Sequence, residues 1–256
     1  MKLFAENIAI TKGKKTICSS LQLALAAGDF LGILGPNGCG KTSLLQTLAG
    51  IHPTSSGQIW LDGQELSELS AAAIAKHIAI LFQDTHFIFP QTVFEYCLTA
   101  RYPHLSFFKR ESEHDMELVI DALTATDLIQ FKHQPVTMLS GGEKRRLSIA
   151  AVLAQTPDIF LLDEPINHLD VRHQIKILHH FHHLITADSK ALAVTLHDMN
   201  MAQQFCNRIL LLFQDGSIIQ GTPQEVMTTE NLSRLYHHPV KKISNGEITL
   251  WWPVEN

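Results

Sequence analysis

Residues 35 to 42 read Gly35-Pro36-Asn37-Gly38-Cys39-Gly40-Lys41-Thr42, and Ser43 follows them directly. The apolar run at 30–34 is typical of a strand, and residues 41–48 are typical of a helix start. Glycine dihedrals let successive backbone N–H groups converge on one anion, and the following helix adds its positive end. Lys41 adds a mobile charge, and the Thr42 hydroxyl can bind magnesium. We therefore predict that residues 35–43 form a phosphate-binding loop between a strand and a helix.

The composition excludes several classes of protein. The chain has 256 residues and a formal net charge of −5, and its Lys and Arg residues form no long basic tract. That length allows a substantial core, and the charge pattern disfavours nucleic acid as a partner. No stretch reaches about 18 apolar residues, and the N-terminus lacks a secretion signal, so any membrane role should come through a partner. The cysteines form no CxxC pair, which favours a reducing compartment: Cys18, Cys39, Cys97 and Cys206.

Strand and helix signals suggest a nucleotide-binding core interrupted by a helical part. Residues 92–156 show helical spacing and no convincing strand. Strands that alternate with helices predict an α/β protein with a mainly parallel sheet. We expect a single domain, 1–256, in which 1–84 and 158–256 form the core and 85–157 form a helical subdomain. Apolar or alternating runs predict strands at 7–11, 21–25, 57–63, 78–82, 159–162, 191–195 and 209–213, with hairpins through 217–219 and 244–247.

Polar side chains follow three of these strands, where nucleotide hydrolysis would need them. Asp163 and Glu164 end the strand at 159–162, so Asp163 could hold magnesium while Glu164 serves as general base toward water. His197 could hydrogen-bond the γ-phosphate, and Gln83 could contact magnesium or water. His197 or Gln83 alone is more often an ordinary surface polar residue. Their joint placement after successive strands favours the catalytic interpretation.

Residues 139–143 open a second glycine-rich helix. Ser140 is a candidate N-cap, Gly141 and Gly142 allow close approach, and an apolar-periodic segment follows. Exposed helix N-termini attract anions. On physical grounds alone, an ordinary capped helix explains this stretch equally well.

Six motifs occur in the order found in the ATP-binding subunits of ABC transporters, which this chain resembles over essentially its whole length. They are the phosphate loop, Gln83, and residues 139–143, 159–164, 167–170 and 195–198. The resemblance implies a P-loop NTPase (RecA-like) fold with an N-terminal antiparallel β subdomain and an inserted helical subdomain. It also implies an ATPase that uses ATP and Mg²⁺, and two copies that hold ATP between them. Ser140, Gly141 and Gly142 would then serve the partner's nucleotide, and Asp170 would link the two sites.

Within that family, residues 101–105 and 163–174 resemble the corresponding stretches of subunits that serve importers of iron-siderophore, haem or cobalamin complexes. The resemblance implies a homodimer on two transmembrane permease subunits, with a substrate-binding protein acting through the permease. It implies a peripheral location at the cytoplasmic face of the inner (plasma) membrane. Some apolar residues could form the groove that docks the permease, although core packing explains at least half of them equally well: Phe87, Ile88, Phe89, Pro90, Phe94, Phe107 and Phe108.

Two residues depart from the family pattern, and a histidine-rich stretch is a separate feature of the chain. Lys12 stands where the family usually has an aromatic residue that stacks on adenine, which leaves selectivity for adenine over guanine open. Ile166 replaces a small hydroxyl residue at a position not expected to touch phosphate. The stretch at 179–183 spaces imidazoles so that they could chelate a metal, but no carboxylate or Cys lies nearby in sequence. A solvated helix face is therefore the favoured interpretation of that stretch.

Two other functions share some of these motifs. A soluble ABC-type ATPase that remodels nucleic acid or a protein assembly would tend to carry coiled-coil insertions, paired ATPase domains or basic extensions. None of these is apparent in the sequence. A nucleotide kinase would share the phosphate loop but leave residues 139–143 and His197 without a role. The favoured interpretation is an ATPase subunit that drives a membrane importer.

Overall fold

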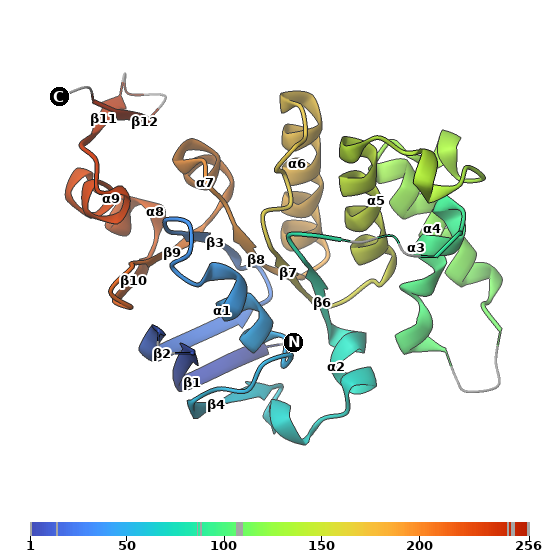
Figure 1. Ribbon diagram of the computed structural model, residues 1–256, viewed down its shortest axis with the longest axis horizontal. Coiled ribbons are helices and arrows are strands. Elements are labelled where there is room, and N and C mark those ends of the chain that lie inside the picture. The colour runs from blue at the N-terminus through green and yellow to red at the C-terminus, as the bar shows by residue number, and fades with distance from the viewer. Residues whose placement is uncertain are drawn as a thin grey trace.

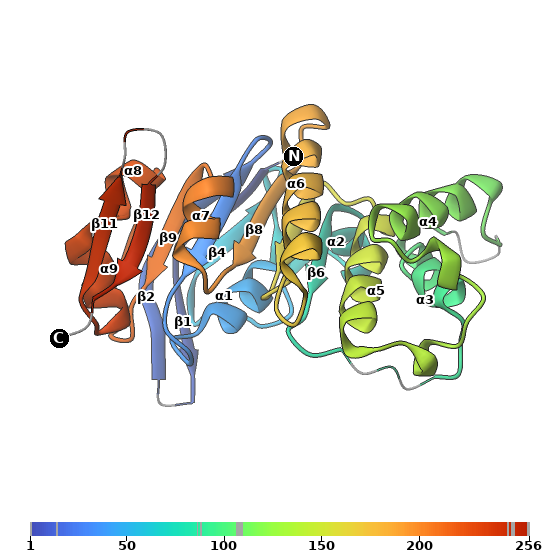
Figure 2. The same cartoon turned by 90° about the horizontal axis from the view of Figure 1, so that it is seen from above.

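A computed structural model describes residues 2–13, 15–85, 87, 89–105, 110–244, 246 and 249–254. Its central sheet has one face against a second, antiparallel sheet and the other against helices (Figure 1). Helices α3 to α5 lie at one end of the molecule and the C-terminal strands lie at the other, as both Figure 1 and Figure 2 show.

The central sheet has the strand order β10-β9-β3-β8-β7-β6. Every neighbouring pair is parallel except β10 and β9, which are antiparallel. β3, β7 and β8 are buried at each residue, as expected for apolar strands covered on both faces. The predicted mainly parallel sheet is therefore confirmed. The strands are β3 (Phe30–Leu34), β6 (Ile78–Leu81), β7 (Ile159–Leu162), β8 (Ala191–Thr195), β9 (Arg208–Leu212) and β10 (Ile218–Gly221).

The antiparallel sheet has the order β2-β1-β4-β5. Its alternating inward residues share one core with the central sheet and with α1 (Lys41–Leu48). The predicted antiparallel β part is thus present. The strand predicted at 57–63 ends earlier because Asp62 and Gly63 adopt positive φ angles of 49° and 83° and make the turn into β5. The strands are β1 (Lys2–Lys12), β2 (Lys15–Ala26), β4 (Ser56–Leu61) and β5 (Gln64–Glu65).

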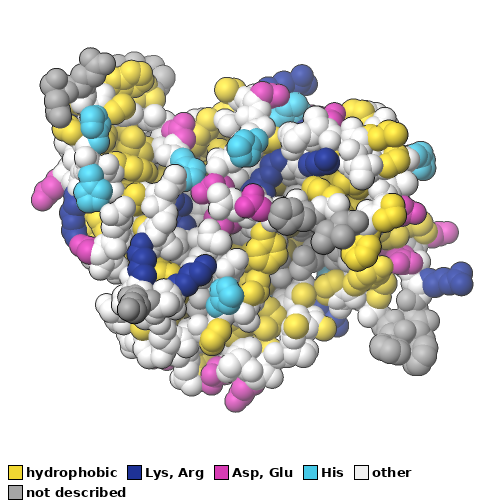
Figure 3. All heavy atoms as spheres, viewed as in Figure 1, with side chains coloured by type: hydrophobic (Ala, Val, Ile, Leu, Met, Phe, Trp, Pro, Cys, Tyr) yellow, Lys and Arg dark blue, Asp and Glu magenta, His cyan; other side chains and the backbone are white. Residues whose placement is uncertain are grey.

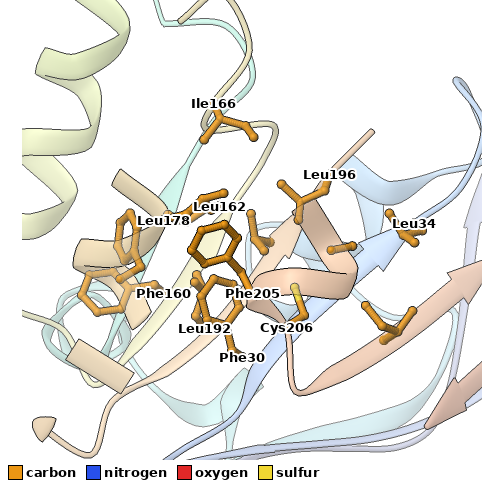
Figure 4. Packing of buried hydrophobic residues seen from close by; sticks show 14 of the residues in the cluster. Phe30, Leu34, Phe160, Leu162, Ile166, Leu178, Leu192, Leu196, Phe205 and Cys206 are labelled. Carbon is orange, nitrogen blue, oxygen red and sulfur yellow. The ribbon is translucent and has the colours of Figure 1, made fainter. Parts of the chain in front are cut away.

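A second core fills the opposite face of the central sheet (Figure 4). The Phe160 ring on β7 meets the Phe181 ring on α6 edge to face, with their centroids 5.3 Å apart. The predicted C-terminal hairpin is confirmed by the pairing of β11 with β12, and Asn245 and Glu247 of its turn lie outside the described residues. The elements are α6 (Val171–Ala187), α7 (Met199–Phe205), α8 (Pro223–Val226), α9 (Thr229–Tyr236), β11 (Val240–Ser244) and β12 (Thr249–Pro253).

The region predicted to be helical has its own hydrophobic cluster, formed by α3, α4 and α5. In the described part of residues 85–157 there is no strand, only an isolated bridge between Thr92 and Pro135. Each of the three helices begins with a capping box, which explains where it starts. The helices are α3 (Val93–Thr99), α4 (Glu113–Ala125) and α5 (Gly141–Ala154), with 3₁₀ turns at Tyr102–His104, Ile129–Phe131 and Val136–Met138; η1 (Leu66–Glu68) and α2 (Ala71–His77) precede β6.

Candidate active site

The predicted phosphate loop connects β3 to α1 and depends on its glycines. Gly38 and Gly40 adopt φ angles of 74° and 121°, in the region that favours glycine. A Cβ at Gly40 would lie 2.5 Å from the Ile17 side chain, and one at Gly35 would lie 2.5 Å from the Leu212 carbonyl oxygen. These close approaches leave no room for another residue at either position. The path of the loop between β3 and α1 therefore requires glycine at both positions.

Lys41 is buried and lies across this loop. Its Nζ donates to the carbonyl oxygens of Gly35 and Pro36, at 2.8 and 3.3 Å. Lys15, from β2, donates to the carbonyl of Gly38. Burial raises the pKa of the Cys39 thiol above its ordinary value, against the opposing effect of Lys41. Cys39 forms no disulfide, and the cationic side chains that contact the loop are Lys15 and Lys41.

A cleft of about 610 Å³ opens beside the loop. It brings Gln83, Glu164 and His197, which follow three different strands, together with the loop. Six further predicted residues line it: Asn37, Gly38, Gly40, Lys41, Thr42 and Ser43. Lys15, Ile17 and Asn167 also line it, although they were not predicted as site residues. Lys12 also lines the cleft, and no Phe, Tyr or Trp is among these lining residues. Figure 3 shows acidic and histidine side chains gathered in the middle of one face, with Lys and Arg side chains on either side.

Three side chains surround the Glu164 carboxylate. Gln83 Nε2 donates to Oε2 at 3.1 Å, and Asn167 Nδ2 donates to the same oxygen at 2.6 Å. His197 Nε2 lies 2.7 Å from Oε1. The backbone of Glu164 adopts a φ of 49°, an uncommon conformation for a residue with a side chain. The carboxylate is thus fixed at the wall of the cleft, where it could accept a proton from a water molecule.

Thr195 joins the two carboxylate residues, a role that sequence reasoning missed. Its hydroxyl donates to Asp163 Oδ1 at 2.7 Å and accepts the Glu164 N–H at 2.7 Å. The other oxygen, Asp163 Oδ2, is buried, and the described residues offer it no hydrogen-bond partner. Unpartnered buried carboxylate oxygens are costly unless a cation or water completes them. The Asp163 carboxylate therefore has the chemistry that a hard cation such as Mg²⁺ requires, and Thr42 and Gln83, which line the cleft, also carry side-chain oxygens.

The other predicted residues lie at two helix starts, and they do not line this cleft. Of the residues already described, Gly35, Pro36, Cys39 and Asp163 are not among its lining residues either. Ser140 caps α5, where it forms a capping box with Glu143; Ser140 and Gly141 are exposed, and Gly142 is half-buried. A Cβ added at Gly141 would meet nothing within 4 Å among the described residues. Asp170 caps α6 by accepting the His173 N–H, and the hydrogen bonds from His173 lower the pKa of Asp170. The predicted site residues thus fall into two groups.

The histidine stretch at 179–183 and the described apolar docking candidates are not among the residues that line the cleft. His179, His182 and His183 are exposed on α6, while His180 is half-buried and burial lowers its pKa. The described residues include no group of three His, Cys, Asp or Glu side chains placed to hold a metal. Phe87 packs against Tyr96 with ring centroids 4.9 Å apart, whereas Phe89 is exposed. Three of the apolar docking candidates lie outside the described residues: Ile88, Phe107 and Phe108. No described helix is long and apolar enough to span a bilayer.

Known proteins resemble this chain over nearly its full length. The family model described as ABC transporter matches residues 18–167. The ferric enterobactin transport ATP-binding protein FepC of Escherichia coli (strain K12) is 37% identical over 235 residues, which is 92% of this chain and 87% of that protein. The hemin import ATP-binding protein HmuV of Pseudomonas aeruginosa is 36% identical over 239 residues, 91% of this chain and 92% of that one.

Solved structures share the fold. A metal-chelate type ABC transporter in an inward-facing conformation gives a TM-score of 0.85 at 28% identity, covering 99% of this chain and 97% of that chain. A dimeric post-hydrolysis state of the ATP-binding cassette MJ0796, bound to ADP and Pi, gives a TM-score of 0.75 at 25% identity, covering 86% of this chain and 98% of that chain.

Proposed function

This chain belongs to the ABC transporter family and is an ATP-binding ATPase, and we propose that it powers the import of iron-siderophore, haem or cobalamin complexes through a membrane permease. The observation that carries the hydrolytic part of the proposal is the Glu164 carboxylate, held by Gln83, Asn167 and His197 at the wall of the cleft beside the phosphate loop. The import part is carried by the likeness to transport ATP-binding proteins.

The chemistry assigned to these residues is hydrolysis of the terminal phosphoanhydride bond. A water molecule attacks the γ-phosphorus while Glu164 accepts its proton, the bond to the β-phosphate oxygen breaks, and ADP leaves. Lys41 and the loop N–H groups stabilise the negative charge of the phosphates. His197 orients the γ-phosphate or the water. Mg²⁺, when bound, neutralises part of the phosphate charge, and Thr42, Gln83 and Asp163 are the residues that would hold it.

A second copy of the chain would complete each site. Ser140, Gly141 and Gly142 do not line their own cleft, and Ser140 and Gly141 are exposed. We assign them to the ATP of the partner copy, with Asp170 at the interface between the sites. The dimeric cassette MJ0796 supports this arrangement. Six residues of the phosphate loop are assigned instead to the ATP of their own chain: Gly35, Pro36, Asn37, Gly38, Gly40 and Ser43.

The cargo class and the partners come from the relatives. FepC is named for ferric enterobactin transport, and HmuV is named for hemin import. We assign to this chain two permease subunits, a substrate-binding protein that delivers cargo to them, and a peripheral position at the cytoplasmic face of the inner membrane. The remodelling ATPase considered from the sequence gains no support, because these relatives are transport proteins.

The test measures the uptake of iron-siderophore, haem and cobalamin complexes by cells from which the gene for this chain has been deleted. Complementation with the wild-type chain should restore uptake of one of these labelled cargo classes. Glu164→Gln should bind ATP with unchanged affinity, lower ATP turnover by roughly 100-fold or more, and fail to restore uptake. Turnover by Glu164→Gln at the wild-type rate would remove Glu164 as the base, and uptake of all three classes without this chain would reject the proposed cargo.

A further inference from the structure

Arg145, on α5, is buried at 9% exposure and uses all of its N–H donors. A guanidinium has about five such donors in a rigid planar fork. Each of them here reaches a backbone carbonyl oxygen: Nη1 donates to Phe82 at 2.7 Å and Gln83 at 3.0 Å, Nη2 to Asp163 at 2.6 Å and Glu164 at 2.7 Å, and Nε to Pro165 at 3.2 Å.

None of these acceptors belongs to the helices around α5. Phe82 and Gln83 follow β6 directly, and residues 163–165 follow β7. These are the two segments whose side chains meet at the Glu164 carboxylate, where Gln83 Nε2 donates to Oε2. Burial lowers the pKa of Arg145, while the nearby Asp163 and Glu164 carboxylates oppose that effect. A single side chain of α5 therefore fixes the backbone on both sides of the proposed catalytic base.

The adjacent residue shows that a buried arginine on α5 need not do this. Arg146 is buried to the same degree, at 8% exposure. Its Nη1 donates to the carbonyls of Thr126 and Asp127 at 2.7 and 2.9 Å, and both lie at the end of α4 within the helical part. Arg146 thus holds the helices to one another, whereas Arg145 holds α5 to the strand ends of the sheet.

We propose that Arg145 is a positioning residue that couples the Ser140–Gly142 end of α5 to the catalytic base Glu164 of the same chain. The inference rests on the proposed function, in which that end of α5 contacts the partner's ATP. A shift of α5 as it meets the partner's nucleotide is transmitted through the rigid guanidinium to the backbone of Gln83 and Glu164. Each chain therefore aligns its own base only when it has engaged the ATP of the other copy.

The substitution Arg145→Lys separates this role from simple packing. Lysine keeps the positive charge but has about three donors on a flexible stem, so it cannot hold both strand ends in one plane. Arg145→Gln provides a second, neutral variant. Arg146→Lys is the matched control, because it removes a guanidinium of equal burial from the next position of the same helix. All variants are compared as full chains at a temperature where each remains folded.

Three quantities are measured for each chain: ATP affinity with a fluorescent analogue, turnover as a function of ATP concentration, and ATP-driven dimerisation in a Glu164→Gln background. For both Arg145 variants we expect turnover about tenfold lower and a Hill coefficient reduced toward one, with ATP affinity unchanged. Dimerisation should require several-fold more ATP. Arg146→Lys should lower the melting temperature but keep the wild-type Hill coefficient.

Two results would overturn the inference. The first affects the role of Arg145 alone, and the second affects the proposed function as well. If the Arg145 variants lose turnover and cooperativity no more than Arg146→Lys does at a similar loss of thermal stability, then Arg145 is a packing residue. If the Glu164→Gln parent binds ATP but does not dimerise, then the proposed function fails at the dimer, and the coupling fails with it.

Discussion

Two glycine-rich helix starts in this chain, those of α1 and α5, present their backbone N–H groups in opposite ways. No side chain caps α1, and the loop before it lines a cleft of about 610 Å³. The start of α5 is capped by Ser140, which forms a capping box with Glu143, and Gly141 beside it is exposed. A helix start of either kind can attract an anion, but only the α1 start lies beside a cleft that is also lined by Gln83, Glu164 and His197. A glycine-rich helix start thus becomes a binding site through what surrounds it.

The two helix starts also differ in what positions them, and the proposed role of Arg145 follows from that difference. The α1 start follows β3 and Glu164 follows β7, so both are positioned by strands of the same sheet. The α5 start belongs to a helical part with a hydrophobic cluster of its own. If the two starts act on two different ATP molecules, their relative placement has to be controlled, and the hydrogen bonds of Arg145 cross the boundary between them.

The largest expected effect comes from charging the exposed helix start. Gly141→Asp adds a side chain where no described atom lies within 4 Å, so the fold should be retained. The carboxylate would face the partner's nucleotide and repel its phosphates. We expect ATP binding by the separate chain to be unchanged and hydrolysis to fall by roughly 100-fold, as when a preorganised donor is lost. Gly141→Ala is the uncharged control. Wild-type hydrolysis by Gly141→Asp would show that α5 takes no part in the site.

Removing the charge at the enclosed helix start should affect binding instead. Lys41 is bound only to loop carbonyls among the described residues, so it can turn toward a phosphate. Loss of a charged hydrogen bond of about 1.5–3 kcal/mol should weaken ATP binding by Lys41→Ala roughly 10-fold to 100-fold. Lys144→Ala, at the other helix start, is the control and should bind ATP normally. Isothermal titration calorimetry measures both, and equal losses in the two variants would erase the contrast.

Much of the enclosed site could be predicted because its residues adjoin recognisable strands. The phosphate loop, Asp163, Glu164 and His197 each follow an apolar run, and parallel strands bring such positions to one edge. Thr195 and Arg145 could not be predicted in the same way. Thr195 reads as the last residue of a strand, and Arg145 reads as part of a basic run at a helix surface. Their roles depend on which strand ends are neighbours, and strand order is set by tertiary packing.

A smaller effect is expected from a change at Thr195, whose hydroxyl hydrogen-bonds both Asp163 and Glu164. Thr195→Val would leave the Glu164 N–H and Asp163 Oδ1 without their hydroxyl partner in a buried position. An unsatisfied buried group costs about 1–3 kcal/mol, so we expect that loss in the free energy of unfolding and a turnover about tenfold lower. Thr195→Ser keeps the hydroxyl and should restore both. Denaturant titration and ATPase assays provide the measurements, and equal behaviour of the Val and Ser variants would contradict the bridging role.

The smallest effect concerns the frame that carries the exposed helix start. Asp115 on α4 accepts from Arg101 Nε at 2.9 Å, and Arg101 Nη1 donates to the carbonyl of Ala154 at the end of α5. Hydrogen bonds from Ser112, and then from Arg101, hold the pKa of Asp115 below its ordinary value of 3.8. A depressed folded-state pKa stabilises the fold above the unfolded value and loses that contribution as the pH falls toward the folded one.

We therefore expect Asp115→Asn to lower the free energy of unfolding by about 1–2 kcal/mol at pH 7, because a charged hydrogen bond is replaced by a neutral one. The difference from the wild-type chain should stay constant down to about pH 5 and shrink below about pH 4, where the wild-type carboxylate begins to lose its advantage. Glu117→Gln, an exposed change on the same helix, is the control. A difference that instead grows as the pH falls would mean that Asp115 does not anchor α5 through its charge, and that the exposed helix start is held in place by packing alone.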